Sequence, residues 1–401
     1  MQAHRITCNS ASSLRLGLIL LLFASWVTFA APAGAFEYED VPRFEMKAGM
    51  SQSAFKQQTQ PVQAKPSGMD ALAFRMRLPK DWGEVGGVDG FDGGGGLELS
   101  SSLLSTVVHY RGPGSLEGQS FFKLKARKLK HIITARKWFM HFILNEGYSL
   151  EAIHEISPRK VAVRYTTFKS RTNTSYTVLA IAAINGDQLA LAEYYVPTER
   201  MNEKRRDHQT LSMRAFELTN KVDTPVEPIE TYNFVDIASI DYPASWLIKT
   251  SRVRNLDKMN VSLYNTEKDK LERWQNYISR DNFKGRIRIK LIARKKAESI
   301  QAEIKEIKKE FQKRDLGTDK LIREIEGINY DRDFDLARTQ AYTVHDKSGT
   351  YLDFQLWVSV MRSPRYYVFA TLFTPDRENA YYNWAVNSEA FKFVLSRLDI
   401  K

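Results

Sequence analysis

The side chains most able to do chemistry in this sequence are its histidines, and their spacing is not typical of a metal or catalytic site. Six of the seven histidines lie beyond residue 35. None is part of a His-Glu-x-x-His arrangement, and the adjacent His154 and Glu155 would point to opposite faces of a strand. We therefore expect ordinary surface or core residues at each position, namely His109, His131, His141, His154, His208 and His345.

Three acidic or glycine-rich segments suggest other chemistry, and each has a simpler structural interpretation. Asp331, Asp333 and Asp335 form an acidic patch, but a glycosidase needs two carboxylates across a cleft, and a polar turn is favoured. Residues 86–96 are rich in glycine and aspartate but lack the ligand pattern of a calcium loop. Residues 111–115 resemble a phosphate loop without its Gly-Lys-Ser/Thr ending, so their serine is interpreted as a helix cap.

Composition narrows the class of protein. The only cysteine is Cys8, so thiolate catalysis and cysteine-based metal sites are excluded from the rest of the chain. The formal net charge of +12 favours an anionic partner, such as an acidic face of an envelope protein, an anionic lipid or an acidic glycan. A hydrophobic content of 43% over 401 residues is ample for two or three domains with buried cores.

The N-terminus has the pattern of a secretory signal peptide. Arg5 and Arg15 precede an apolar segment at residues 16–31, and small residues follow at 33–35. Cleavage is expected after Ala35, which predicts a periplasmic or secreted protein and disfavours nucleic acid as a partner. The alternative, an uncleaved anchor, is less favoured because the apolar segment is shorter than the ~20 residues of a span. No later segment is apolar enough to cross a bilayer.

The elements that must position any site occur in two similar series. Near the C-terminus, strand-like runs at 351–360 and 366–374 are followed by Pro375 and a helical pattern. Earlier, runs at 176–184 and 188–196 flank Asn185-Gly186-Asp187, a strong signal for an antiparallel hairpin.

Short motifs support an internal duplication. Pro79-Lys80-Asp81-Trp82 matches Pro243-Ala244-Ser245-Trp246, residues 193–197 match 371–375, and residues 213–218 match 388–393. We therefore predict a signal peptide (1–35), a flexible linker (36–68), a first α+β repeat (69–222), a linker (223–230) and a second α+β repeat (231–401).

Basic residues are concentrated in two predicted elements. A long amphipathic helix is expected at 116–146, and a strand with alternating basic and apolar residues at 285–293. A solvated charged helix face is the simpler interpretation, whereas contact with an anionic partner is the functional one. The candidate partner contacts are Lys123, Lys125, Arg127, Lys128, Lys130, Arg136, Lys137, Arg286, Arg288, Lys290, Arg294, Lys295 and Lys296.

The order of elements predicts an α+β architecture made of two tandem copies of an antiparallel sheet packed with helices. Each copy resembles the PsbP-like fold in its Pro-x-x-Trp entry strand, its paired hairpin, its proline and its C-terminal helix. The resemblance implies a PsbP-like sandwich with a non-catalytic accessory role in an exported compartment. No cofactor ligands match, so no cofactor is expected.

We therefore expect an exported, non-enzymatic accessory or binding protein of a cell-envelope complex, which docks an anionic partner through basic surfaces. Two alternatives remain open at this point. One is a hydrolase with a dispersed acidic or histidine site between the repeats, and the other is a lipid or glycan carrier.

Overall fold

The computed structural model describes residues 41–401 apart from 67, 86–103, 116–117, 251–254, 267–283, 314, 331–333 and 348–352. The chain divides into two units, Met1–Pro42 and Arg43–Lys401, and everything below concerns the second. The expected signal peptide and the glycine-rich segment at 86–96 lie outside the described residues.

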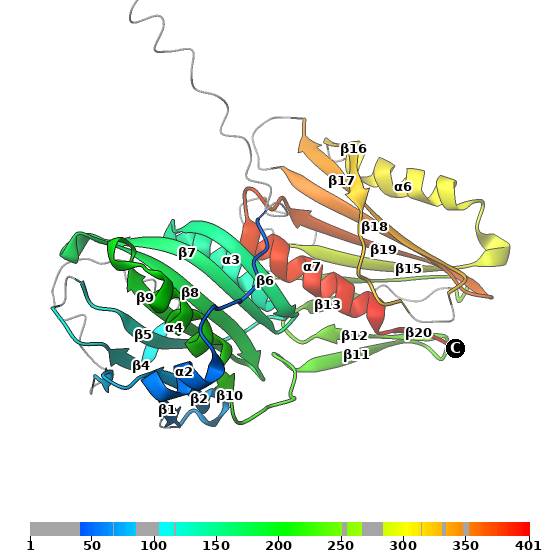
Figure 1. The fold of residues 1–401 in the computed structure, drawn as a ribbon. Helices are drawn as coiled ribbons and strands as arrows, with labels where there is room; N and C mark the ends of the chain where they lie inside the picture. Colours follow the sequence, from blue (N-terminus) through cyan, green and yellow to red (C-terminus); the bar gives the residue numbers. More distant parts are fainter. Residues whose placement is uncertain are drawn as a thin grey trace, which may run out of the picture. The chain divides into compact units, whose positions relative to one another are not determined.

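Two seven-stranded antiparallel sheets form the body of this unit, and their strand orders correspond position by position (Figure 1). The first has the order β3-β4-β5-β9-β8-β7-β6 and the second the order β13-β14-β15-β19-β18-β17-β16. The first sheet comprises β3 (Gly83–Glu84), β4 (Ser105–Arg111), β5 (Phe121–Lys128), β6 (Ser149–Ser157), β7 (Lys160–Lys169), β8 (Thr174–Asn185) and β9 (Gln188–Pro197). The second comprises β13 (Leu247–Thr250), β14 (Lys258–Tyr264), β15 (Arg286–Ala293), β16 (Leu316–Glu324), β17 (Leu336–Asp346), β18 (Phe354–Arg362) and β19 (Tyr366–Pro375).

A three-stranded antiparallel sheet accompanies each large sheet, and the two small sheets also correspond in strand order. The first small sheet comprises β1 (Thr59–Ala64), β2 (Phe74–Pro79) and β10 (Glu217–Leu218). The second comprises β11 (Ile229–Phe234), β12 (Ala238–Pro243) and β20 (Leu398–Ile400).

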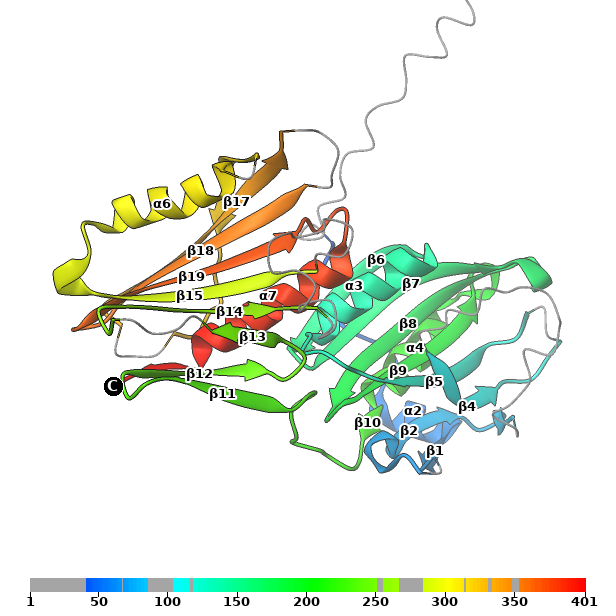
Figure 2. The same ribbon diagram turned by 180° about the vertical axis from the view of Figure 1, so that it is seen from behind.

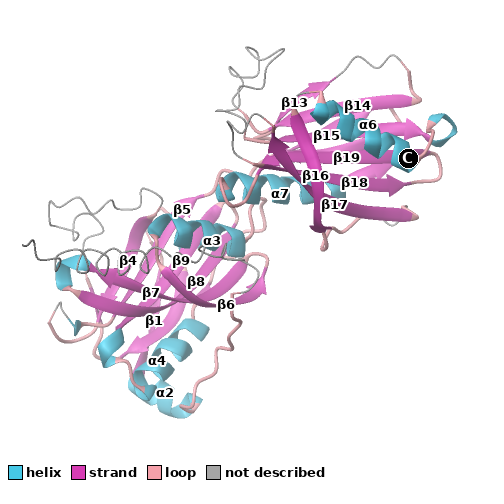
Figure 3. Cartoon of the chain, turned by 90° about the horizontal axis from the view of Figure 1, so that it is seen from above, coloured by secondary structure: helices cyan, strands magenta, loops and turns pink. Residues whose placement is uncertain are grey.

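Helices cover both faces of each large sheet, as the two opposite views show (Figures 1 and 2). They are α2 (Gln52–Gln58), α3 (Ala135–Glu146), α4 (Glu203–Arg214), α6 (Ile300–Gln312) and α7 (Tyr381–Ser396), drawn in cyan in Figure 3. On one face of the first sheet, Phe139 of α3 packs on Tyr165; on the other, Met213 and Phe216 join the core that contains Phe122. Phe311 of α6 packs on Phe373 in the second half, and Phe391 of α7 packs on Trp357.

The α+β class with mostly antiparallel sheets is therefore confirmed. The predicted hairpin at 176–196 is confirmed as β8 and β9, in which Asn185 pairs with Gln188 across a tight turn whose Gly186 has a φ of 60°. The alternating segment at 285–293 is confirmed as strand β15. Both Pro-x-x-Trp motifs form the same turn, because the backbone N–H of the tryptophan donates to the proline carbonyl in Trp82 (3.1 Å) and in Trp246 (2.9 Å).

The long basic helix predicted at 116–146 is wrong. Residues 121–128 form strand β5, and only Ala135–Glu146 is helical. Apolar and basic residues alternate with period two along β5, with Leu124 buried between partly exposed Lys123 and Lys125, and this period belongs to a strand. The helix begins at Thr134, whose hydroxyl accepts from the Lys137 N–H at 3.3 Å.

The prediction of a structureless linker at 36–68 is wrong for residues 52–64. These residues form α2, which buries Phe55, and β1, which pairs antiparallel with β2. Most β1 side chains are exposed or half-buried, so the strand carries little hydrophobic pattern of its own and depends on its partner.

One detail of the expected duplication is also wrong. Glu217 in β10 pairs with Arg75 in β2, and Asp399 in β20 pairs with Ser239 in β12. Counted from the two Pro-x-x-Trp motifs, Arg75 and Ser239 occupy equivalent positions. Residues 213–218 therefore correspond to the chain around β20 rather than to 388–393, because α7 is a turn longer than α4.

Candidate functional site

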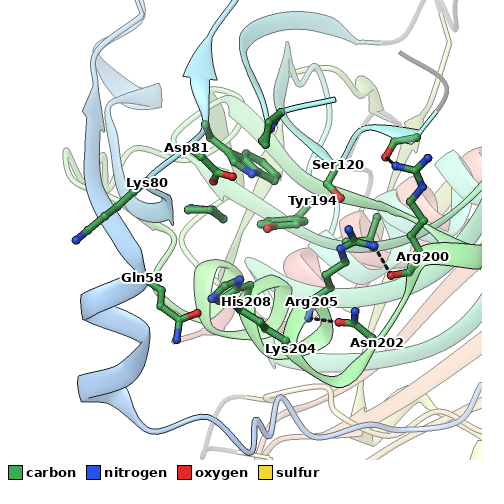
Figure 4. A pocket seen from close by; sticks show the side chains of 16 residues that line it. Gln58, Lys80, Asp81, Ser120, Tyr194, Arg200, Asn202, Lys204, Arg205 and His208 are labelled. Carbon is green, nitrogen blue, oxygen red and sulfur yellow. Dashed lines mark hydrogen bonds between the residues drawn. The ribbon is translucent and has the colours of Figure 1, made fainter. Parts of the chain in front are cut away.

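A pocket of about 550 Å³ lies beside the Trp82 turn in the first half (Figure 4). Its walls come from the end of α2, the turn after β2, the segment between β4 and β5, strand β9 and the beginning of α4. The rings of Trp82 and Tyr194 contact each other with centroids 4.8 Å apart. Both side chains are almost fully buried, so the aromatic pair forms a rigid wall.

Glycines allow the segment between β4 and β5 to approach this wall. A Cβ on Gly112 would lie 2.7 Å from the indole Nε1 of Trp82, which is closer than atoms can pack. A Cβ on Gly118 would collide with the guanidinium of Arg200, which donates to the Gly118 carbonyl at 3.0 Å. The glycine-rich turn that resembled a phosphate loop thus lines the pocket without the sequence of such a loop.

The first turn of α4 brings basic side chains to the pocket. The Asn202 side chain caps the helix by accepting from the Arg205 N–H at 2.9 Å. The Arg205 guanidinium donates to the Arg200 carbonyl at 2.6 Å, which fixes both arginines at one wall (Figure 4). Lys204 and His208 are four residues apart and share a helix face.

The charges of the pocket are not balanced. Lys80, Arg200, Lys204 and Arg205 line it with a single carboxylate, that of Asp81. In the part of the chain that the structure describes, none of these four cations forms an ion pair. Figure 4 shows Lys80 at the rim, extended outward, whereas the guanidinium of Arg205 lies beside Tyr194. The pocket therefore presents a net positive charge to whatever enters it.

Burial changes the protonation of two pocket groups. Burial raises the pKa of Tyr194, and the nearby Asp81 carboxylate raises it further. Burial lowers the pKa of His208, and the charge of Lys204 lowers it further. At neutral pH the phenol is therefore protonated and the imidazole neutral, so both can form hydrogen bonds with a ligand without adding charge.

Within the described residues, two polar atoms of the pocket side chains have no hydrogen-bond partner. They are Oε1 of Gln58, at the end of α2, and Nε2 of His208, on α4, and both atoms are buried. Unpaired buried atoms also occur outside the pocket, at His131 Nδ1 and Trp138 Nε1 for example, so these two atoms do not by themselves mark a ligand site.

The basic residues that the sequence singled out lie elsewhere and are mostly paired with acids. Lys125 contacts Glu193, and Lys290 contacts Glu303 in the second half. Seven of the thirteen form such ion pairs: Lys125, Lys128, Arg136, Lys137, Arg288, Lys290 and Lys295.

The other six differ in their surroundings. Lys123 lies over the Phe121 ring, Arg286 over Phe311 and Arg294 over Tyr367. Arg127 is half-buried on β5, and Lys130 and Lys296 are exposed. The structure does not gather the thirteen residues into one surface, and their contact with a partner stays a prediction.

The remaining candidate residues are dispersed. His131 and His141 lie against Tyr382, and Asp335 binds Arg362 at 2.7 Å. Asp331 and Asp333 lie outside the described residues. Within the described ranges, no three or more His, Cys, Asp or Glu side chains are arranged to hold a metal ion. None of the helices in this part of the chain combines the length and apolar character that a membrane crossing requires.

Sequence reasoning missed the pocket cations on and before α4. A signal was present, because residues 200–206 contain four basic residues. Their convergence with Trp82 and Gln58 depends on tertiary structure and has no local pattern.

Comparison with known proteins gives distant likenesses only. No family model and no curated protein matches the chain. Among solved structures, the cyanobacterial PsbP (CyanoP) of Synechocystis is 11% identical, over 40% of this chain and 92% of that chain, with a TM-score of 0.28. The Ran-binding protein Mog1p of Saccharomyces cerevisiae is 8% identical over 43% and 96%, with a TM-score of 0.27. The immunity protein TplEi of Pseudomonas aeruginosa is 9% identical over 82% and 94%, with a TM-score of 0.20. Scores this low carry no conclusion about function.

Proposed function

We propose that this chain is an exported, non-enzymatic binding protein that serves as an accessory component of a cell-envelope complex and docks an anionic partner. The observation that carries the proposal is the pocket beside Trp82, where Arg200, Lys204 and Arg205 lie together and Lys80 lies at the rim, none with an ion pair in the described part of the chain. Like charges held close together repel one another, and an anionic group relieves that repulsion.

The contrast with the other basic residues supports this location. Lys125, Lys290 and five further candidates are already neutralised by acids. A partner would have to displace those acids, which is costly where the pair is buried, as in Lys125–Glu193, and gains little where the pair is largely exposed, as in Lys128–Asp187. The pocket cations need no such displacement, so we place the main contact there.

We further propose that the two halves are copies of one PsbP-like module. The matching strand orders of the large and small sheets support this, as do the two identical Pro-x-x-Trp turns. The copies differ at the turn itself, where Lys80 and Asp81 of the first correspond to Ala244 and Ser245 of the second. In this proposal the first copy holds the binding site.

A second candidate function is hydrolysis, and one observation supports it. Asp81, Tyr194 and His208 line the same pocket, and a carboxylate, a phenol and an imidazole can share proton transfers. Hydrolysis of an ester or a glycoside would favour this candidate over pure binding if both Asp81→Asn and His208→Gln abolish that hydrolysis.

The experiment that tests the binding proposal is capture of partners from envelope extracts by the mature chain, at about 50 mM and about 300 mM salt. We expect capture that weakens steeply with salt. Lys204→Glu should lose most of it, because this side chain is exposed at the pocket and bears no structural bond in the described part of the chain.

The matched control is Arg206→Glu, which makes the same charge change on an exposed residue of α4 outside the pocket. It should retain capture. Capture that ignores salt, or an equal loss in both variants, would contradict the proposal.

A further inference from the structure

Three basic side chains of the pocket are within reach of a solute. Arg200 and Lys204 are exposed and Arg205 is half-buried, and all three line the pocket. The aromatic wall lies deeper, because Trp82 and Tyr194 are only 7% and 3% exposed. A solute that enters therefore meets the basic side chains first, and its contact with them decides what the pocket selects.

The two arginines are held so that one edge of each guanidinium stays available. Nη1 of Arg200 donates to the Gly118 carbonyl at 3.0 Å, and Nη1 of Arg205 donates to the Arg200 carbonyl at 2.6 Å. The Nε and Nη2 donors of both residues have no partner in the described part of the chain. These two donors form the fork that binds an oxyanion in a bidentate manner. The backbone bonds fix each fork before a ligand arrives, so little side-chain freedom is lost on binding.

The number of donors favours an anion with more than two oxygens. A carboxylate has two oxygens and is filled by a single arginine fork. The phosphoryl group of a monoester has three terminal oxygens and a charge of about −1.5 to −2 at neutral pH, so it can accept from both arginines. The Arg205 guanidinium contacts the backbone of Arg200 itself, which keeps both forks at one wall (Figure 4).

The charges favour the same group. Three cations line the pocket with a single carboxylate, that of Asp81, and Lys80 lies at the rim. A singly charged ion leaves part of this positive excess unbalanced. Coulomb attraction is proportional to the charge of the ion, so a dianion gains about twice as much as a monoanion at the same distance.

We infer that the pocket binds the phosphoryl group of a phosphomonoester, in preference to a carboxylate or a phosphodiester. The terminal oxygens lie against the forks of Arg200 and Arg205, and Lys204 adds the third positive charge. This inference rests on the proposed binding function and names the anionic group that the partner carries.

Calorimetric titration of the mature chain at about 50 mM salt tests it, with methyl phosphate, dimethyl phosphate and acetate as probes. Methyl phosphate is a dianion, whereas the other two carry one charge and differ in the shape of the anionic group. At about pH 7.5 we expect methyl phosphate to bind at least about tenfold more tightly than either, because the second fork adds charge-assisted hydrogen bonds. At about pH 5 the second charge of methyl phosphate is lost, and this advantage should shrink.

Lysine substitutions separate the forks from the charge. Arg200→Lys and Arg205→Lys keep the positive charge but lose the bidentate fork, so each should remove most of the preference for methyl phosphate and change acetate binding by less than about twofold. Arg206→Lys is the matched control, since Arg206 is exposed on the same helix and does not line the pocket. It should keep the preference.

A further variant removes charge without breaking a backbone bond. Lys204→Gln should weaken methyl phosphate more than acetate, because the dianion loses about twice the attraction. Urea unfolding of each variant shows whether it is folded, and Lys204→Gln keeps the test valid if an arginine variant does not fold.

Vesicles distinguish a lipid from a soluble source of the phosphoryl group. Phosphatidic acid carries a phosphomonoester headgroup, and phosphatidylglycerol carries a diester. Stronger co-sedimentation with phosphatidic acid than with phosphatidylglycerol at equal surface charge assigns a lipid headgroup. Binding of methyl phosphate without this difference assigns a soluble phosphomonoester, and both results support the inference.

Acetate or dimethyl phosphate binding as tightly as methyl phosphate would overturn the inference, as would an unchanged preference in folded Arg205→Lys. If no probe binds while the chain still captures an anionic partner through Lys204, the inference fails and the proposed function stands. If neither binding is found, both fail.

Discussion

Glu193 is an ionisable side chain with no exposed surface in the middle of the first large sheet. It accepts hydrogen bonds from the hydroxyls of Tyr165 and Tyr195, the latter at 2.9 Å, and contacts the Lys125 ammonium at 3.0 Å. Burial raises the pKa of both tyrosines, and the Glu193 charge raises them further. Both phenols therefore remain donors, which keeps the buried carboxylate satisfied.

This arrangement predicts that Lys125→Met destabilises the protein by about 3–5 kcal/mol, because it leaves a buried carboxylate without its counter-charge. The double variant Lys125→Met/Glu193→Leu should recover part of that loss. Lys128→Met is the control, since it breaks a largely exposed ion pair with Asp187 and should cost below about 1 kcal/mol. Urea unfolding measures all three; equal losses for Lys125→Met and Lys128→Met would show that burial does not matter here.

Among the elements, the tight turn after β2 controls the shape of the pocket. Gly112 packs against the indole of Trp82, and any side chain there must push the ring aside. We predict that Gly112→Ala displaces Trp82, lowers stability by about 1–3 kcal/mol as overpacking does, and abolishes ligand binding at the pocket.

Gly83 provides the comparison, because a Cβ there meets nothing within 4 Å. Gly83→Ala should leave both stability and binding unchanged. Thermal unfolding measures the stability of both variants, and capture of the anionic partner measures their binding. If Gly112→Ala binds as well as the wild type, the Trp82 ring does not shape the site.

The elements also show what the sequence can predict. Tight-turn chemistry identified the hairpin at Asn185-Gly186, and alternation identified β15, since both signals are local. Residues 121–128 also alternate, but the apolar spacing of the longer segment 116–146 favours a helix, and the structure corrects this. Strand β1 contains Pro61 and two glutamines and forms only because β2 lies beside it, so no local pattern predicts it.

The candidate site was less predictable than the fold. The basic run at 200–206 and the glycine turn at 111–115 are visible in the sequence, yet the pocket also needs Gln58 and Asp81 from distant segments. Ion pairing is equally hidden in the sequence: the basic residues expected on a helix at 116–146 indicate a docking surface, whereas Lys125 lies on β5 and is neutralised by Glu193 of the neighbouring strand β9.

On the scale of the whole molecule, each half has apolar core residues of its own, and the halves also contact each other where Lys137 of α3 pairs with Glu389 of α7. One core contains Phe74, Phe122 and Phe216, and another contains Phe311 and Phe373. Each half also contains its own large and small sheet. Domains with their own cores and exposed linkers usually fold alone.

We therefore predict that residues 41–224 and 225–401, produced separately, each fold and unfold cooperatively in urea. Circular dichroism should show strand-rich spectra for both. A control cut within the first sheet gives residues 41–173, which should be unfolded or aggregated, and residues 174–401, in which only the second half should fold. Failure of both halves of the first pair would argue for one indivisible fold and against the duplication.

Trp82 and Trp246 are two of the seven tryptophans in the sequence, and each ends a turn of the same kind. One indole borders a cationic pocket, and the other is in an equivalent turn where alanine and serine replace the charged neighbours. Emission from the first should respond to an arriving solute, while the second supplies an unperturbed baseline within the same polypeptide. A change of emission on binding should therefore be lost in Trp82→Phe and kept in Trp246→Phe.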